Sequence, residues 1–407
     1  MGLSVSDGPV SGLRAEKGSQ TVGLESVRAN RTLRVVIDMT FPNRLQTGTR
    51  VYANELVAAL RENSSHCFTC LAEPVPKRSR TIGEKIWNGI RNVFWMQVVL
   101  PYKLYRMKAD VLHATSFFAP LISPCPVIVT VHDTMYLSNP KHYRDRFFLL
   151  YARLFIKPAV KRCALINTVS EASRRDIVSV FGVPDTKVQV IYHGVNSRFH
   201  PSRQPAEVAL LRSKYQLDSP FFLFVGALEP RKNLSRLIQA FDLFLKTVRD
   251  DQKFQLVLAG PGGSASEELL EIARQLHISQ HIRMLGYVPD EDIPALYSAT
   301  TAFVFPSLGE GFGLPIVEAM ACGTPVVSSN VSCIPEVAGD AALLVDPLET
   351  KAIADAMYRV TYDESLRREL VSKGLERAKL FNWSQTAAET ERLYELVCSE
   401  KRRGFLS

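Results

Sequence analysis

Two glutamates bracket a glycine-rich turn in the second half of the chain. Glu310 and Glu318 lie eight positions apart, with Gly311 and Gly313 between them. A short apolar run before the turn is typical of a buried strand, and Pro315 suits a first helical turn, where a missing N–H group costs nothing. Glycine lets the backbone approach a ligand closely, and the free N–H groups of a helix start favour phosphate. This order predicts a phosphate-binding turn between a strand and a helix.

The two carboxylates suit different parts of one ligand. Glu318 lies one turn inside the predicted helix, so it cannot usefully face a phosphate at the helix start. A carboxylate there is better placed to accept hydrogen bonds from a diol such as a ribose. Glu310 lies in the turn itself, and we expect it to meet the group that is transferred.

Two adjacent cations follow another predicted strand. The apolar segment 221–225 is followed by Gly226 and then by Arg231 and Lys232, just before a predicted helix. Positive side chains at a helix start oppose the helix dipole, so they favour an external anion. Arg binds phosphate oxygens as a fork and Lys adds a point charge, which together suit the diphosphate of a departing nucleotide. A solvent-exposed pair without a ligand is the alternative interpretation.

The residues that follow the neighbouring predicted strands are weaker evidence for a ligand-binding site. The segment 255–259 ends at Gly260, which favours another close approach of the backbone to a ligand. Tyr287 and Val288 follow the next strand and offer backbone groups to the edge of a nucleobase. The acidic run 290–292 looks like a metal-binding triplet, but it directly precedes a predicted helix. We therefore interpret it as helix capping and expect no metal.

His132 is the candidate catalytic residue of the first half. It follows a strand predicted over 127–131 and precedes Asp133, so its imidazole is expected near the reaction centre. His113, at the end of an earlier predicted strand, is the competing candidate. Gly48 lies in the turn before the first predicted helix and would let an incoming group approach the backbone.

Short apolar segments alternate with helix-length segments along both halves of the chain. The predicted strands are 33–37, 68–71, 111–113, 127–131, 164–168 and 188–192 in the first half, and 221–225, 255–259, 281–285, 302–305, 325–328 and 341–345 in the second. This alternation predicts an α/β fold with doubly wound parallel sheets. Ligands bind outside the carboxyl ends of such strands, where the candidate residues fall.

A chain of 407 residues is longer than a domain with one ordinary hydrophobic core, which favours two domains. We expect segments with the bounds 1–30 (a mobile tail), 31–200 (an N-terminal Rossmann-like domain), 201–219 (a linker region), 220–382 (a C-terminal Rossmann-like domain) and 383–407 (a C-terminal helix). The tail lacks the apolar core of a signal peptide, and no apolar run reaches the ~20 residues of a membrane span. Seven cysteines, an odd number, favour reduced thiols. We therefore expect a cytoplasmic protein.

Positive charge is concentrated in the first half. Residues 1–200 contain 27 Lys and Arg against 14 Asp and Glu, whereas residues 201–407 contain 22 against 27. The segments 77–108 and 141–162 carry eight and seven basic residues, interleaved with aromatic ones. Such clusters suit an anionic membrane surface, and ordinary solvated helix faces are the alternative interpretation. No nucleic-acid-binding module is recognisable, so we expect no nucleic-acid partner.

The most specific motif is Glu-Gly-Phe-Gly-Leu-Pro at 310–315, followed by Glu-Ala-Met-Ala-Cys-Gly-Thr-Pro-Val-Val at 318–327. With the Gly48 turn, His132 and the Arg-Lys pair within 226–233, it resembles the retaining, nucleotide-sugar-dependent glycosyltransferases of family 4. The resemblance covers about residues 33 to 400. It implies the GT-B fold, in which two doubly wound Rossmann-like domains face each other across a cleft.

The resemblance also implies roles for the two domains. The N-terminal domain would bind the acceptor and the C-terminal domain the nucleotide sugar, while the final helix would return to the N-terminal domain. His132, Glu310, Arg231 and Lys232 are the implied catalytic residues, with His132 near the reacting face of the sugar. Such enzymes use no metal and no further cofactor. The implied donor-binding residues are Gly48, Gly226, Arg231, Lys232, Gly260, Tyr287, Val288, Glu310, Gly311, Phe312, Gly313, Leu314 and Glu318.

We expect transfer of a hexose to a saccharide or lipid-linked acceptor in the assembly of a surface polysaccharide. The segments 94–101 and 229–233 resemble bacterial mannosyltransferases, so GDP-mannose is the first expected donor and a UDP- or dTDP-sugar the second. No first-domain carboxylate is identified as a nucleophile, which favours front-face attack with the leaving phosphate helping to take the acceptor's proton. The expected location is peripheral, on the inner face of a membrane. The alternatives are a sugar-nucleotide epimerase of the same fold and a catalytically dead nucleotide-sugar-binding protein.

Overall fold

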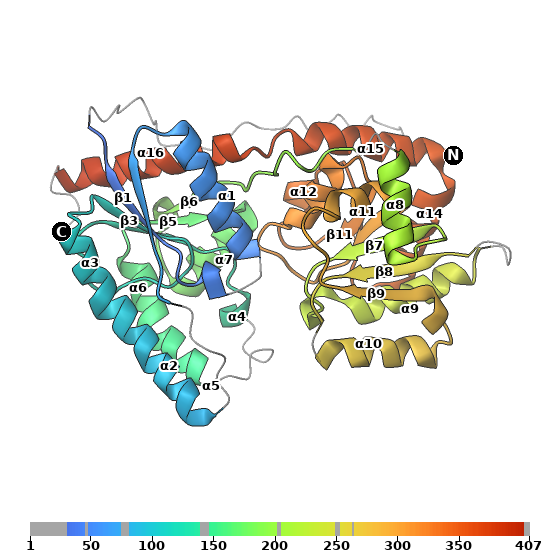
Figure 1. The fold of residues 1–407 in the computed structure, drawn as a ribbon, viewed down its shortest axis with the longest axis horizontal. Coiled ribbons are helices and arrows are strands. Elements are labelled where there is room, and N and C mark those ends of the chain that lie inside the picture. Colours follow the sequence, from blue (N-terminus) through green and yellow to red (C-terminus); the bar gives the residue numbers. More distant parts are fainter. Residues whose placement is uncertain are drawn as a thin grey trace, which may run out of the picture.

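A computed structural model describes residues 31–44, 48–74, 81–138, 146–201, 205–248, 253–262 and 264–402. It contains two parallel six-stranded sheets that lie side by side (Figure 1). The two doubly wound α/β sheets predicted from the sequence are therefore confirmed. The predicted tail over 1–30 lies outside the described residues, as do residues 202–204 of the predicted linker.

The first sheet has the strand order β2-β1-β3-β4-β5-β6. Its strands are β1 (Arg34–Asp38), β2 (Cys67–Leu71), β3 (Val111–Ala114), β4 (Val127–Thr130), β5 (Leu165–Thr168) and β6 (Val188–Val190). Alternate residues of β1 enter different cores, since Val36 packs in one apolar cluster while Val35 and Ile37 pack in another. Both faces of this sheet are thus buried, which explains why its strands are apolar almost throughout.

The second sheet has the order β12-β11-β10-β7-β8-β9. Its strands are β7 (Phe221–Val225), β8 (Gln255–Ala259), β9 (Ile282–Gly286), β10 (Ala302–Phe305), β11 (Val326–Ser329) and β12 (Leu343–Val345). The strand order reverses between β7 and β10, where the rings of Phe224 and Phe305 stack 5.6 Å apart. The segments that follow these two strands consequently emerge side by side, at the point where open α/β sheets bind ligands.

Helices connect the strands in both domains. The first sheet is accompanied by α1 (Gly48–Asn63), α2 (Ile82–Phe94), α3 (Leu100–Arg106), α4 (Met135–Ser138), α5 (Arg146–Tyr151), α6 (Lys157–Arg162) and α7 (Glu171–Phe181). The second is accompanied by α8 (Pro205–Tyr215), α9 (Leu234–Leu245), α10 (Ser264–Gln275), α11 (Ile293–Ala299), α12 (Leu314–Ala321), α13 (Ile334–Ala338), α14 (Thr350–Tyr362) and α15 (Glu364–Ala378). Five-residue π-helical turns join α2 to α3 and α5 to α6.

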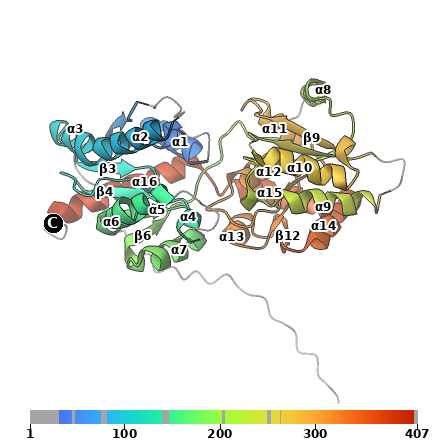
Figure 2. The ribbon, with the colours of Figure 1, turned by 90° about the horizontal axis from the view of Figure 1, so that it is seen from below.

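The last helix, α16 (Trp383–Arg402), returns to the first domain (Figures 1 and 2). Its residues Trp383 and Tyr394 are buried in the same apolar cluster as β1. The chain passes between the domains twice, once after β6 and again just before α16. The two passages lie against each other, because Val195 pairs with Asn382 in an isolated β-bridge. A Cβ atom on Gly194 would lie 2.2 Å from the backbone nitrogen of Trp383, so this contact requires glycine. The two crossings therefore form one packed connection.

The capping interpretation of the acidic run 290–292 is wrong for Asp292. This residue precedes α11, but its side chain caps no N–H group of that helix. Its carboxylate instead accepts hydrogen bonds from Lys214 Nζ at 2.6 Å and Tyr215 OH at 2.5 Å, and so fastens α8 to α11. Across the described ranges, no group of three or more His, Cys, Asp or Glu side chains could hold a metal ion. No helix in those ranges is both long and apolar enough to cross a bilayer.

Candidate active site

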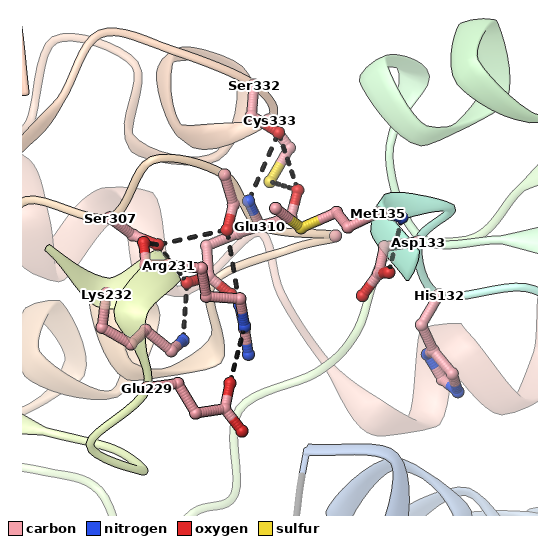
Figure 3. A network of polar contacts seen from close by, with 12 residues as sticks. His132, Asp133, Met135, Glu229, Arg231, Lys232, Ser307, Glu310, Ser332 and Cys333 are labelled. Carbon is pink, nitrogen blue, oxygen red and sulfur yellow. Dashed lines mark hydrogen bonds and ion pairs between the residues drawn. The ribbon is translucent and has the colours of Figure 1, made fainter. Parts of the chain in front are cut away.

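Arg231, Lys232 and Glu310 form a compact charged cluster at the junction of β7 and β10 (Figure 3). Arg231 Nη1 donates to Glu310 Oε2 at 2.8 Å, and Lys232 Nζ donates to Oε1 at 2.6 Å. Ser307 Oγ also donates to Oε1 at 2.6 Å. Although burial opposes ionisation of Glu310, the two cations hold its pKa at about 2. The cations expected to await an external anion are thus already paired with an internal one.

The two cations differ in their access to a ligand. The Lys232 side chain is only 7% exposed, and its ammonium lies 4.7 Å from the centre of the Phe305 ring. The Arg231 side chain is 31% exposed and is also paired with Glu229. Arg231 can therefore contact phosphate oxygens directly, whereas Lys232 acts mainly through its charge.

The glycine-rich turn leads into α12 as the sequence predicted. Gly313 takes the left-handed conformation, with φ at 90°, just before the first residue of the helix. Phe312 is buried, and its ring packs against His193 and Phe381, at centre distances of 4.9 Å and 5.4 Å. The side chain of Phe312 thus anchors the turn in the protein interior.

Glu318 lies inside α12, where its carboxylate accepts a hydrogen bond from Tyr297 OH at 3.2 Å. Burial raises its pKa to about 7, and the charge of Arg198 opposes this rise. The carboxylate therefore changes charge near neutral pH, in a position that suits the ribose role expected for it.

His132 lies across the domain boundary, at the end of β4. Its Nε2 is 3.1 Å from the carbonyl oxygen of Thr115, and because a carbonyl only accepts, Nε2 must carry the proton. Burial lowers the pKa of His132 to about 4, so the ring is neutral at pH 7. Its Nδ1 is then a hydrogen-bond acceptor, with no donor among the described residues. This tautomer suits a ligand hydroxyl.

His113, the competing candidate, has a structural position. Its ring nitrogens lie 2.7 Å from Tyr394 OH and 2.8 Å from Thr130 Oγ1, and the residue is fully buried. Burial lowers its pKa to about 3. Both nitrogens are therefore committed to joining α16 to the first sheet.

The first domain touches the glycine-rich turn directly. Ser170 Oγ donates to the carbonyl oxygen of Gly311 at 2.7 Å, and Ser173 Oγ lies within hydrogen-bonding distance of the carbonyl oxygens of both Gly311 and His132. A Cβ atom on Gly309 would lie 2.6 Å from Met135 Cε. Sequence reasoning missed these serines, since Ser170 reads only as a helix cap.

A second link between the domains involves α7. The Glu336 carboxylate, from α13, accepts from the backbone nitrogens of Glu171 and Ala172 at 2.7 Å and 3.1 Å. It also accepts from Tyr192 OH at 2.9 Å. Figure 2 shows α7 and α13 facing each other across the boundary. A side chain of one domain thus caps a helix of the other.

The remaining predicted site residues have different surroundings. Gly226 and Gly260 lie backbone to backbone, since a Cβ on Gly260 would be 2.0 Å from the Gly226 carbonyl oxygen. This packing by itself accounts for the glycine at 260. Tyr287 is exposed and Val288 is buried. Gly48 begins α1, and a Cβ there would meet no atom within 4 Å.

Two family models match the two halves of the chain. One, described as Glycosyltransferase Family 4, matches residues 47–199, and the other, described as Glycosyl transferases group 1, matches residues 210–377. Among curated proteins, O-antigen chain mannosyltransferase B of Escherichia coli is 41% identical over 231 residues. The matched region is 56% of this chain and 60% of that protein, so it spans less than two thirds of the relative.

Solved structures share the whole architecture. Sucrose-phosphate synthase from Thermosynechococcus elongatus has a TM-score of 0.70 at 22% identity, covering 91% of this chain and 100% of that one. HepE from Anabaena, in complex with UDP and glucose, has a TM-score of 0.69 at 18% identity, covering 89% and 99%. At these identities the likeness shows the fold alone, and it confirms the predicted GT-B fold.

Proposed function

Because the chain belongs to the family 4 glycosyltransferases, we propose that it transfers a hexose from a nucleotide sugar to an acceptor with retention of configuration. The observation that carries this proposal is the cluster of Arg231, Lys232 and Glu310, which lies at the strand-order reversal and faces the His132 segment (Figure 3). Positive charge fixed at this point would stabilise the diphosphate that departs from the sugar.

In this proposal each part of the site holds one part of the donor. Arg231 contacts the diphosphate, and Glu318 accepts hydrogen bonds from the ribose. The backbone of 311–314 holds the sugar, with His132 accepting a hydrogen bond from one of its hydroxyls through Nδ1. The acceptor attacks on the face from which the phosphate leaves.

Arg231→Ala tests the role of the charge cluster. Removing one preorganised contact to the leaving group costs about 3 kcal/mol, which is about a 100-fold loss of turnover. Arg274→Ala is the matched control, because Arg274 is an exposed arginine of α10 in the same domain. Wild-type turnover by Arg231→Ala would refute this mechanism.

We take GDP-mannose as the first donor, because the E. coli relative is named a mannosyltransferase. A UDP- or dTDP-sugar is the second, and HepE was solved with UDP and glucose. A panel of nucleotide sugars, assayed by nucleotide release with and without acceptor glycosides, decides between them. Acceptor-dependent transfer of labelled sugar separates a transferase from an epimerase, and no release with any donor identifies a dead binding protein.

We also propose that the first domain docks on an anionic membrane, where a lipid-linked acceptor in surface polysaccharide assembly would be available. The continuous helical stretch from α2 to α3 exposes a row of large apolar side chains at steps of three or four residues. These are Trp87, Ile90, Phe94, Val98, Tyr102 and Tyr105. Trp87 is 65% exposed and Phe94 57% exposed, so the fold does not use this face for packing.

Cations flank this apolar row. Lys103 and Arg106 lie exposed on α3. Arg153 and Lys161 lie exposed on the segment from the turn after α5 through α6, which packs in the same apolar cluster as α3. An apolar stripe beside cations suits the interface of an anionic bilayer. Such docking would place the protein peripherally on the inner face of a membrane.

Vesicle sedimentation tests the docking surface. Vesicles that contain phosphatidylglycerol should bind the wild type, and the double variant Trp87→Ser/Ile90→Ser should bind at least about tenfold more weakly. Leu210→Ser is the control, because Leu210 is 73% exposed but lies in the second domain. Equal binding to neutral and anionic vesicles would refute the electrostatic part of the proposal.

A further inference from the structure

Asp133 follows His132 at the carboxyl end of β4 and points from the first domain toward Arg231 (Figure 3). Its Oδ1 accepts a hydrogen bond from the backbone nitrogen of Met135 at 3.1 Å. No described residue donates a hydrogen bond to Oδ2. One carboxylate oxygen is therefore held in place, and the other remains available to a ligand.

Contacts between the domains fix Asp133 relative to the glycine-rich turn. A Cβ atom on Gly311 would lie only 3.4 Å from Asp133 Cβ. On either side of Asp133, Ser173 Oγ lies 3.1 Å from the carbonyl oxygen of His132, and Met135 Cε lies close to Gly309. Asp133 is thus positioned against the backbone that would hold the donor sugar.

The charge of Asp133 is not needed to balance the cations of the cluster. Glu310 already pairs with both Arg231 and Lys232, and Glu229 pairs with Arg231. Burial raises the pKa of Asp133, and the charge of Arg231 opposes this rise. A half-buried carboxylate with a raised pKa is a better proton acceptor than an ordinary aspartate.

The edge of the first sheet that carries Asp133 also carries aromatic rings that suit a saccharide. Aromatic rings gather at the carboxyl ends of the adjacent strands β1, β3 and β4. Phe117 lies 4.5 Å from Tyr136 and 4.6 Å from Phe118, which in turn lies 4.6 Å from Phe41. Apolar ring surface beside one polar group that accepts hydrogen bonds can hold the C–H face and the hydroxyls of a sugar ring.

We propose that Asp133 binds the attacking hydroxyl of the acceptor saccharide and accepts its proton, in place of the leaving phosphate that the sequence favoured for this role. This role rests on the proposed transferase function. The acceptor oxygen forms a bond to the anomeric carbon while its O–H bond breaks, and the proton goes to Oδ2 of Asp133. The bond between the anomeric carbon and the phosphate oxygen breaks with its electron pair on the phosphate. Asp133 then returns the proton to solvent.

The test compares Asp133→Asn with the wild type, using the nucleotide sugar identified by the donor panel and an octyl hexoside that the wild type glycosylates. Asparagine keeps the size of the side chain and the bond to Met135 but cannot accept a proton at neutral pH. The transfer kcat should fall about 100-fold or more, which is the usual contribution of a general base. The dissociation constant for the nucleotide should stay within about threefold, because the second domain holds it.

The pH profile separates proton acceptance from a structural role. Wild-type kcat, measured at saturating donor so that the effect of Glu318 on donor affinity does not enter, should fall at low pH as Asp133 becomes protonated, and Asp133→Asn should lose this acidic limb. Asp185→Asn is the control, since Asp185 is an exposed aspartate of the same domain and pairs with Arg174. Undiminished turnover by Asp133→Asn, or a lower turnover with the acidic limb intact, overturns the assignment while leaving the transferase function standing. Absence of transfer by the wild type with every donor overturns the function itself.

Azide gives a second, independent readout. It needs no deprotonation, so it should restore nucleotide release by Asp133→Ala and form a glycosyl azide with the anomeric configuration of the donor. A glycosyl azide of the opposite configuration would instead identify Asp133 as a covalent nucleophile and overturn its role as proton acceptor.

Discussion

The contact between the backbones of Gly311 and His132 makes Gly311→Ala a sharp test of the active arrangement of the two domains. An added Cβ would lie 2.2 Å from the His132 carbonyl oxygen and 2.9 Å from its carbon. Non-bonded heavy atoms prefer about 3.5 Å, so the two segments must separate by about 1.3 Å. Both contact atoms belong to the backbone, which a rotamer change cannot move.

A displacement of this size at a reacting centre costs about 100-fold in rate, so kcat/KM for transfer should fall by about that factor. The free energy of unfolding should fall by only about 1–3 kcal/mol, as for other overpacked contacts. Gly311 does not have a positive φ, so alanine leaves the turn itself unstrained. Nucleotide binding to the second domain should therefore remain within about threefold of wild type.

Gly309→Ala is the matched control. Its Cβ would lie 2.6 Å from Met135 Cε, the far end of a flexible side chain that can move aside. The measurements are transfer kinetics, nucleotide titration calorimetry and urea unfolding of both variants. If Gly311→Ala transferred sugar within threefold of wild type, the domain contact seen in this structure could not be the one in which chemistry occurs.

Three further predictions concern the carboxylates of the site. Glu310→Gln leaves buried Lys232 without its main partner and should cost about 3–5 kcal/mol of unfolding free energy at pH 7. Because the folded-state pKa of Glu310 is depressed to about 2, its stabilisation is complete above about pH 4.5 and lost as pH falls through 2. The deficit of the variant in urea unfolding should shrink over that range, and a constant deficit would contradict the ion-pair explanation. Glu318 has a raised pKa of about 7, so if its carboxylate binds ribose, donor affinity should rise about tenfold from pH 6 to pH 8. Calorimetry of Glu318→Gln should show no such rise. Glu336→Ala removes the carboxylate that accepts from the first two backbone nitrogens of α7, while the Ser170 cap remains, and should cost about 1 kcal/mol. Small-angle scattering should show a larger radius of gyration if this carboxylate also holds the domains together, and an unchanged radius would exclude that role.

Local patterns in the sequence predict much of the fold. The predicted strand 302–305 coincides with β10. The left-handed residue before α12 is Gly313, which lies in the predicted glycine-rich turn. Apolar runs and glycine positions report on the backbone nearby, so such features can be read along the chain. Partners far apart in sequence leave no such signal. The capping prediction was wrong for Asp292 because its carboxylate binds Lys214 and Tyr215, which lie about 77 residues away in the sequence.

The sequence by itself determined the family, the α/β architecture and the order of strand, turn and helix around Glu310. Only the tertiary structure decided which side chains meet. Because β10 lies beside β7, Glu310 meets Arg231 and Lys232. The two cations, which were expected to be free for an external anion, therefore belong to an ion cluster. The same arrangement commits His113 to Tyr394 and turns Asp133, at first only a neighbour of His132, toward the cluster. These outcomes depend on strand order and domain contact, which no local pattern of residues encodes.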